Sequence, residues 1–407
     1  MAKTNAPSRL AAFFRSPRGV IAGLWASFFT YWAAAACYVP YVSMYYESIG
    51  LTGAQIGQLA SIRSMISFIS SLTLAFLSDF FRQRKRVMVI CIIGLSIALV
   101  IFPFALSFAA LLPVVMLYSI FLSPTNAILD ENTLRALDDP RDYSRVRIGG
   151  SVGWGILAFL TGFILDRPGA DLALIFTLHL IFLIPLLALI LILPEGKEKA
   201  RAAPAEKARL RDVWDLLRLP YYAPWLLAIF LWAVPESALI NFLPLHIQNL
   251  GGGAALVGAD IAFTIVGEVI GFTAAKRVQG RIGARRMIAY AFVLRLIWLL
   301  IIPFLTRPGL IPPFQILGGI SFTLIQSGSV NYFNRRAPRH IGTTAQAIRG
   351  AVLLGLGFGI GALVNGALYE SLGSVGMFRV MSVVSAVSLA FALLLRASER
   401  RWERENA

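Results

Sequence analysis

Apolar stretches of about 20 residues recur along this chain and are separated by short polar segments. An α-helix needs about 20 residues to cross the roughly 30 Å hydrocarbon core of a bilayer, so each stretch predicts one membrane-spanning helix. The stretches lie near residues 20–46, 56–77, 87–106, 109–130, 147–166, 172–193, 223–247, 256–275, 287–305, 311–333, 344–369 and 375–395. The pattern therefore predicts an all-α integral membrane protein with twelve transmembrane helices.

Composition supports this interpretation. Hydrophobic residues make up 57% of the chain and charged residues 14%, whereas charged residues are about 25% of a soluble domain. Cys37 and Cys91 lie within apolar stretches, and the three histidines are far apart in sequence. We therefore exclude an ordinary soluble enzyme, and we expect no disulfide framework, metal site or cofactor.

Basic residues lie mainly in the segments between apolar stretches. The formal net charge is +16, and all but six of the 37 Lys and Arg residues lie at the termini or in alternate loops. This bias places those loops and both termini in the cytoplasm, with the helices in the plasma membrane. Because the basic residues are spread over many loops rather than clustered in one patch, we expect no binding of nucleic acid.

The two halves of the chain resemble each other. Arg147 and Arg349 stand at the start of the fifth and eleventh stretches, at an offset of roughly 202 residues that other polar positions share. The segment from Pro194 to Pro220 is the longest and most charged connection. We expect a cytoplasmic N-terminal segment at 1–18, a six-helix bundle at 19–193, a cytoplasmic linker at 194–221, a second, pseudo-symmetric six-helix bundle at 222–396 and a cytoplasmic tail at 397–407.

Ionisable side chains within the apolar stretches are candidates for function, because an unpaired charge in the hydrocarbon core costs several kcal/mol. The candidates are Arg63, Asp130, Glu131, Glu236, Asp260, Glu268, Arg295 and Arg349. A carboxylate within the membrane can carry a coupling proton, and Glu268, Glu236 and Glu131 are the residues we consider for this role. The alternative for each is a salt bridge that only holds helices together.

Two rows of polar side chains recur at helical spacing. Tyr31, Tyr38 and Tyr41 lie in the first stretch, and Ser327 and Asn331 lie in the tenth. Such spacing places hydroxyl and amide groups on one helix face, as the wall of a substrate cavity requires. Interfacial aromatic residues and hydrogen bonds between helices are the alternatives.

The loop after the second stretch resembles the corresponding loop of the major facilitator superfamily, whose pattern is G-x-x-x-D-R-x-x-R-R. The matching residues are Asp79, Arg82, Arg84, Lys85 and Arg86. Ala75 replaces the glycine of that pattern, and Phe80 replaces its first arginine. The resemblance implies a gating loop in which Asp79 holds neighbouring helices together in the outward-facing state.

A closer resemblance is to the branch of this superfamily that contains 3-phenylpropionate, nucleoside and galactoside proton symporters. The most specific run, R-x-R-x-x-G-x-x-G-W, extends from Arg145 to Trp154. Its likeness to the galactoside symporters implies that Asp130, Arg147 and Trp154 hold the substrate.

One feature of the galactoside symporters is missing. They resemble one another in having a histidine and a glutamate early in the tenth helix, whereas the segment from Leu317 to Phe322 contains no ionisable residue. If protons drive transport here, we expect Glu268 with Arg295 to carry the coupling, and Glu236 is the second candidate.

The sequence thus predicts a secondary transporter, not an enzyme, that moves a small organic solute by alternating access. We expect a monomer in the lipid bilayer with H⁺ as the coupling ion. Arginines within helices favour an aromatic or other organic acid as the substrate. A sugar or nucleoside symporter and a drug or metabolite exporter are alternatives. A transporter-like sensor without turnover and a polytopic membrane enzyme are the alternatives from other classes.

Overall fold

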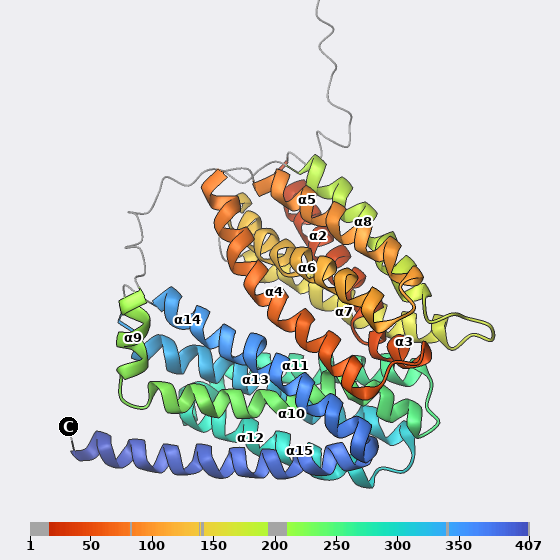
Figure 1. Ribbon diagram of the computed structural model, residues 1–407. Coiled ribbons are helices and arrows are strands. Elements are labelled where there is room, and N and C mark those ends of the chain that lie inside the picture. Colours follow the sequence, from red (N-terminus) through yellow and green to blue (C-terminus); the bar gives the residue numbers. More distant parts are fainter. Residues whose placement is uncertain are drawn as a thin grey trace, which may run out of the picture. The chain divides into compact units, whose positions relative to one another are not determined.

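The computed structural model describes residues 16–81, 84–137, 139, 142–193, 210–338 and 342–405. All regular secondary structure within these ranges is helical (Figure 1). The described residues fall into two compact units, drawn from Met1–Val42 with Ile66–Arg201 and from Ser43–Met65 with Ala202–Ala407. The bundle boundaries expected at 19–193 and 222–396 stay a prediction.

The first unit is built around α2. It contains α2 (Pro17–Tyr38), the C-terminal part of α4 (Gly53–Phe81), α5 (Arg84–Ile101), η1 (Phe102–Phe104), α6 (Phe108–Ala136), α7 (Tyr143–Leu165) and α8 (Leu174–Ile192). Helix α2 packs against α7 and α8, while α5 packs against α6 and α8. These pairings bring α6 and α7, which carry Asp130 and Arg147, next to α2.

Helix α2 ends before Pro40, within the first apolar stretch. Ser16 begins the helix, and its hydroxyl accepts a hydrogen bond from the Gly19 backbone N–H at 3.1 Å. Pro40 has no backbone N–H to donate, so an uninterrupted helix is unfavourable there. The chain makes a turn at Val39–Tyr41 and continues as α3 (Val42–Ser48).

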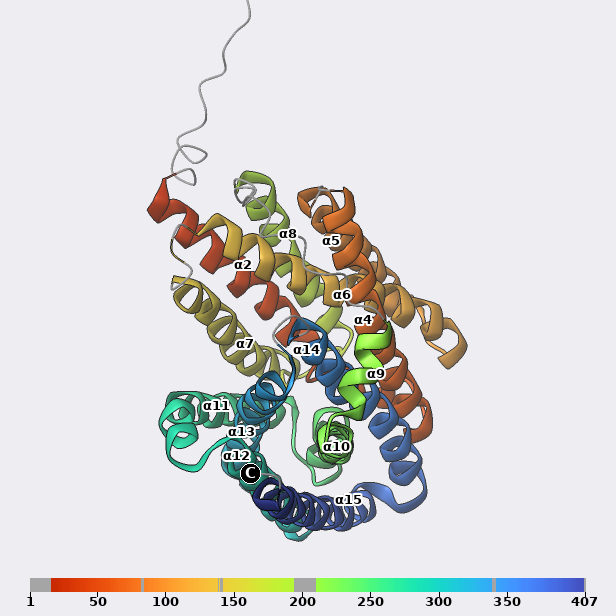
Figure 2. The ribbon, with the colours of Figure 1, turned by 90° about the vertical axis from the view of Figure 1, so that its left-hand side faces the viewer.

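The second unit contains the longest helices. They are α3, the N-terminal part of α4, α9 (Leu210–Arg218), α10 (Tyr222–Asn249), α11 (Ala254–Ile282), α12 (Ala284–Ile301), η3 (Ile302–Phe304), η4 (Pro308–Leu310), α13 (Ile311–Arg336), α14 (Gly342–Gly350), the π-helical η6 (Ala351–Gly357) and α15 (Phe358–Glu405). Helix α10 packs on α15, α11 packs on α13, and α12 contacts both α13 and α15. Figure 2 views α10, α12 and α15 nearly along their axes.

Helix α9 lies within the segment expected to be a linker. Its Leu216 is buried against the core of the second unit, whereas Trp214 is 63% exposed. The charge of this segment predicted an exposed connection but did not indicate a helix. Residues 194–209 of the same segment lie outside the described ranges.

The described helices account for the predicted number of membrane crossings. Ten ranges are long and apolar enough to cross a bilayer, and one of them, Thr344–Glu405, has 62 residues. A single helix of that length would measure roughly 93 Å, three times the hydrocarbon core. Gly373 interrupts it with a left-handed φ of 68°, and the chain turns back there (Figure 1). Counting α4, which has 29 residues, and dividing this range at Gly373 gives the twelve predicted crossings.

Candidate functional site

The first unit holds a cluster of polar side chains between α6 and α7. The Tyr143 hydroxyl donates a hydrogen bond to Asp130 Oδ1 at 2.7 Å, and the Asn126 amide donates to Oδ2 at 3.4 Å. Arg147 Nε lies 4.0 Å from Asp130 Oδ1, and both side chains are about one third exposed, at 33% and 32%. The Arg147–Asp130 pair is therefore loose, and the guanidinium keeps N–H groups that a ligand can accept from.

Aromatic rings of α2 and α7 surround this arginine. The guanidinium carbon of Arg147 lies 5.3 Å from the ring centre of Phe28 and 4.9 Å from that of Trp32. Trp32 in turn contacts Trp154 edge to face, with ring centres 5.7 Å apart. A cation at this distance from a ring face is stabilised by the electron-rich face. The site thus combines one cation with several apolar ring surfaces.

Glycines of the R-x-R-x-x-G-x-x-G-W run bring α7 close to α2. A Cβ at Gly149 would lie 2.6 Å from the Trp25 carbonyl oxygen, and one at Gly153 would lie 2.4 Å from that of Phe29. Real Cβ atoms do not approach carbonyl oxygens so closely, so only glycine allows this helix contact. The glycines of the run therefore position Arg147 and Trp154 against the α2 rings.

The row of tyrosines does not match the expected cavity wall. Tyr38 is 0% exposed and its ring packs against Phe102, Tyr118 and Phe176. Tyr41 lies in the turn after α2, where its hydroxyl donates to the Ala158 carbonyl oxygen. Tyr38 and Tyr41 therefore belong to the packed interior of the first unit.

Tyr31 is the tyrosine of this row that lies beside the Arg147 site. Its ring contacts Trp32 edge to face, with ring centres 5.5 Å apart, and its hydroxyl donates to the Leu122 carbonyl oxygen at 3.1 Å. Helical spacing alone did not distinguish this tyrosine from the buried ones, because all of them recur on a similar helix face.

The second unit contains a buried ion pair between α10 and α12. Arg295 and Glu236 form this pair, with side chains that are 1% and 9% exposed. The Arg295 guanidinium carbon also lies 5.0 Å from the centre of the Trp232 ring. We expected Arg295 to act with Glu268, and the structure instead pairs it with Glu236. Pairing with an opposite charge is how a buried ion avoids a large desolvation penalty.

Close packing of α11 on α13 explains why the dyad of the galactoside symporters has no counterpart. A Cβ at Gly319 would lie 2.1 Å from the Thr264 carbonyl oxygen, and one at Gly267 would lie 2.3 Å from that of Ile316. Large ionisable side chains do not fit where two backbones are so close.

Asp260 of α11 is buried next to α13 without a counter-charge. Its Oδ2 accepts a hydrogen bond from the Gln315 amide at 3.1 Å, whereas its Oδ1 has no hydrogen-bond partner. The side chain is 4% exposed, and no salt bridge to it occurs among the described residues. The sequence placed Asp260 among the membrane carboxylates but gave no reason to prefer it.

The predicted arginines of α4 and α14 bind neutral side chains of the second unit. Arg63 donates to Asn241 Oδ1 at 3.2 Å. Arg349 donates to the side-chain oxygens of Gln346 and Gln326, each at 2.9 Å. Amide partners do not neutralise a guanidinium, so both arginines keep their charge available to an anion.

The remaining polar candidates are held by neighbouring side chains. Asn331 donates to Gln279 Oε1 at 2.9 Å and to the carbonyl oxygen of Ser327 at 2.8 Å. Glu131 accepts from Arg135, one helical turn later, at 2.5 Å. These contacts agree with the alternative of hydrogen bonds and salt bridges that hold the helices.

The predicted gating loop is described only in part. Arg82 lies outside the described residues, as do the side chains of Asp79 and Arg84. Lys85 donates from Nζ to the carbonyl oxygens of Leu191 and Leu193, at 2.8 and 3.1 Å. A lysine there satisfies carbonyl groups at the end of α8, which have no partner within that helix. Arg86 is exposed.

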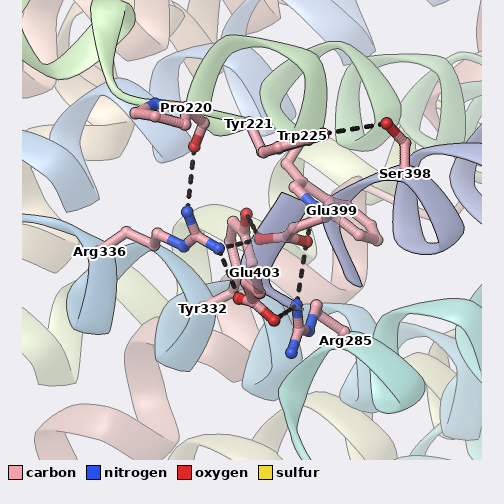
Figure 3. A network of polar contacts seen from close by, with 9 residues as sticks. All are labelled: Pro220, Tyr221, Trp225, Arg285, Tyr332, Arg336, Ser398, Glu399 and Glu403. Atoms are coloured by element: carbon pink, nitrogen blue, oxygen red, sulfur yellow. Dashed lines mark hydrogen bonds and ion pairs between the residues drawn. The ribbon is translucent and has the colours of Figure 1, made fainter. Parts of the chain in front are cut away.

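A network at the ends of α12, α13 and α15 was not predicted. Glu399 of α15 is 0% exposed and forms ion pairs with Arg285 and Arg336 (Figure 3). It also accepts hydrogen bonds from Trp225 Nε1 at 2.9 Å and the Tyr332 hydroxyl at 2.8 Å. The sequence assigned these residues to loops and tail by their charge, and it gave no signal that one glutamate would be buried among them.

Comparison with known proteins places the chain among membrane transporters. The model of the MFS_1 like family matches residues 22–380. The chain is 27% identical over 380 residues to the maltose permease of Geobacillus stearothermophilus, covering 92% of this chain and 94% of the permease. It is also 27% identical over 362 residues to the "Probable 3-phenylpropionic acid transporter" of Escherichia coli (strain K12), covering 88% and 93%.

Solved structures support the same fold. A crystal structure of a variant of the nucleoside transporter NupG matches with a TM-score of 0.84 at 14% identity, covering 92% of this chain and 99% of that one. The twelve-helix fold and the superfamily resemblance inferred from the sequence are confirmed.

Proposed function

The chain belongs to the MFS_1 like family and is a secondary transporter, and from this premise we propose that it carries a small organic anion across the plasma membrane together with protons. Alternating access is the mechanism we propose, with both termini in the cytoplasm and a monomer as the working form. One observation carries the substrate class. Arg147 is flanked by the rings of Phe28 and Trp32, and it is only loosely paired with Asp130.

The chemistry of this cluster suits an aromatic carboxylate. A guanidinium binds a carboxylate through two parallel hydrogen bonds, and such charge-assisted bonds are stronger than neutral ones. The ring faces of Trp32 and Trp154 offer apolar surface to an aromatic group. The similarity to a protein named as a 3-phenylpropionic acid transporter supports the same class.

A sugar is the second candidate, favoured by a specific observation. Asp130 presents a carboxylate close to Trp154, and a carboxylate beside an indole ring suits a sugar that offers hydroxyl donors and an apolar face. The equal identity to a maltose permease also supports this reading. The two candidates differ in what they need from Arg147, because only the anion requires a fixed positive charge.

Binding to purified Arg147→Lys protein tests the proposal. We expect the affinity for 3-phenylpropionate to fall by roughly tenfold or more, because lysine cannot present the planar fork of arginine. Arg145→Lys is the matched control, since Arg145 lies two residues away, is 81% exposed and pairs with Asp142. The control should bind as the wild type does.

The outcome separates the two substrate classes. Wild-type affinity for 3-phenylpropionate in the Arg147→Lys protein would remove this arginine from substrate binding and contradict the proposal. Displacement of bound 3-phenylpropionate by maltose at similar concentrations would favour the sugar candidate instead.

For the coupling of transport to protons, we propose Glu236 in place of Glu268 as the first candidate. Glu236 is the carboxylate that contacts Arg295, so a change in its protonation alters the charge balance of a buried pair. Glu268 is kept as the second candidate.

A further inference from the structure

A cavity lined by arginines lies at one end of the second unit. It has a volume of about 380 Å³ and lies where α12 begins and where α13 and α15 end. Its charged lining consists of Arg285, Arg286, Arg335, Arg336, Arg400 and Glu403. Nothing in the proposed substrate site uses this cavity, because the substrate cluster belongs to the first unit.

Two of these arginines are held in place by glutamates. Arg285 lies 2.8 Å from Glu403 and 3.5 Å from Glu399. Arg336 pairs with the same two glutamates and also donates to the Pro220 carbonyl oxygen at 3.1 Å (Figure 3). Glu399 is fully buried and anchored by two further hydrogen bonds, so the guanidinium groups have a rigid support.

The other three arginines are not neutralised. Arg286, Arg335 and Arg400 form no ion pair with the described residues. Five arginines therefore face two glutamates, which leaves an excess of three positive charges around one cavity. Like charges held together are unfavourable unless an anion binds among them.

The position of the cavity indicates which anion is available. These helix ends belong to the basic side of the protein, which the distribution of Lys and Arg places at the cytoplasmic leaflet. Tyr290 and Trp402, near the same helix ends, are 51% and 36% exposed, and aromatic residues at such positions commonly lie at the level of lipid headgroups. Leu394 of α15 is 70% exposed and offers a surface to acyl chains.

We propose that this cavity binds the phosphate of an anionic phospholipid headgroup in the cytoplasmic leaflet. Arginine forks match phosphate oxygens in geometry and charge. Basic cavities between transmembrane helices on the cytoplasmic side are suited to such headgroups. The proposal rests on the orientation of the protein in the membrane and not on its substrate, so the two can fail separately.

The test compares two triple variants of the purified full chain. One variant carries Arg286→Gln, Arg335→Gln and Arg400→Gln, which removes three charges from the cavity. The control carries Arg281→Gln, Arg401→Gln and Arg404→Gln, which removes three charges from exposed positions of the same helix ends outside the cavity. Binding of phosphatidylglycerol and of phosphatidylcholine is measured by native mass spectrometry in detergent.

We expect the wild type and the control to retain phosphatidylglycerol in preference to phosphatidylcholine. The cavity variant should bind phosphatidylglycerol at least roughly tenfold more weakly, because each arginine near a lipid surface contributes several-fold to anionic lipid affinity. Equal weakening in both triple variants would assign the effect to diffuse surface charge and overturn the proposal.

Soluble phosphates form the second arm of the test. Inorganic phosphate and ATP are added to the wild type, and retention of phosphatidylglycerol is measured again. We expect no displacement at millimolar phosphate. Displacement by ATP or phosphate at micromolar concentration would show that the cavity takes a soluble phosphate and would overturn the lipid assignment.

Discussion

Arg147 is the residue on which the substrate proposal depends. Its charge is flanked by two rings and only loosely paired with a carboxylate, so it can accept an anionic partner without first breaking a tight salt bridge. Arg295 is the opposite case, because it is buried in a close pair with Glu236. The two arginines therefore suit different tasks, substrate binding for the first and charge balance for the second.

The Glu236→Gln variant tests the coupling role. We expect it to lose accumulation driven by a pH gradient while substrate exchange continues, because glutamine keeps the shape of the side chain but cannot release a proton. Both activities are measured in proteoliposomes with labelled substrate, and continued exchange shows that the variant is folded. Glu268→Gln is the matched variant on α11, and we expect it to retain gradient-driven uptake.

Loss of gradient-driven accumulation in Glu268→Gln alone, with Glu236→Gln unaffected, would reverse this assignment. It would restore the carboxylate first expected from the sequence as the proton carrier.

Asp260→Asn tests the state of the buried aspartate. Because this carboxyl group has no counter-charge among the described residues, we expect the substitution to leave the thermal stability unchanged or slightly raised. The melting temperature of the detergent-solubilised protein measures this. A loss of stability of about 3 kcal/mol or more, the usual cost of breaking a buried ion pair, would reveal a charged partner and contradict our reading.

At this scale the sequence predicted residue types better than partnerships. Asp130, Arg147 and Trp154 were found from one motif, and the structure places them in one cluster. Phe28 and Trp32 were missed, because aromatic residues are common in membrane helices and spacing does not reveal which ring faces an arginine. The partner of Arg295 was also missed, since its choice depends on how α10 and α12 are rotated against each other.

At the scale of helices, glycine contacts set the packing. Gly149 and Gly153 bring α7 against α2, and Gly267 and Gly319 bring α11 against α13. The sequence identified the glycines of the α7 motif as part of a resemblance, but their role is physical, since no side chain fits between the two backbones.

Gly319→Ala tests this packing in the second unit. The added Cβ would lie 2.1 Å from the Thr264 carbonyl oxygen, so the helices must separate, and we expect a loss of about 1–3 kcal/mol of stability. Gly309→Ala is the control, because a Cβ there meets no atom within 4 Å. Melting temperatures of both variants provide the measurement, and equal values would refute the close α11–α13 contact.

At the scale of the whole molecule, length and hydrophobicity were sufficient to predict the helices. Twelve apolar stretches correspond to the helices observed, although α2 breaks at Pro40 and the last long helical range turns at Gly373. Such breaks depend on single residues and do not change an average over twenty positions. The substrate was not predictable in the same way, because one fold serves relatives named for maltose and for 3-phenylpropionic acid.

Uptake of labelled 3-phenylpropionate into proteoliposomes tests the central claim most directly. The liposomes are made alkaline inside and acidic outside, and protein-free liposomes are measured in parallel because an aromatic acid crosses bilayers unaided in its neutral form. The account predicts faster uptake with the wild-type protein than without protein, collapse of this uptake by a protonophore, and its loss in Arg147→Lys but not in Arg145→Lys. Uptake equal to that of protein-free liposomes, together with gradient-driven uptake of maltose, would contradict it.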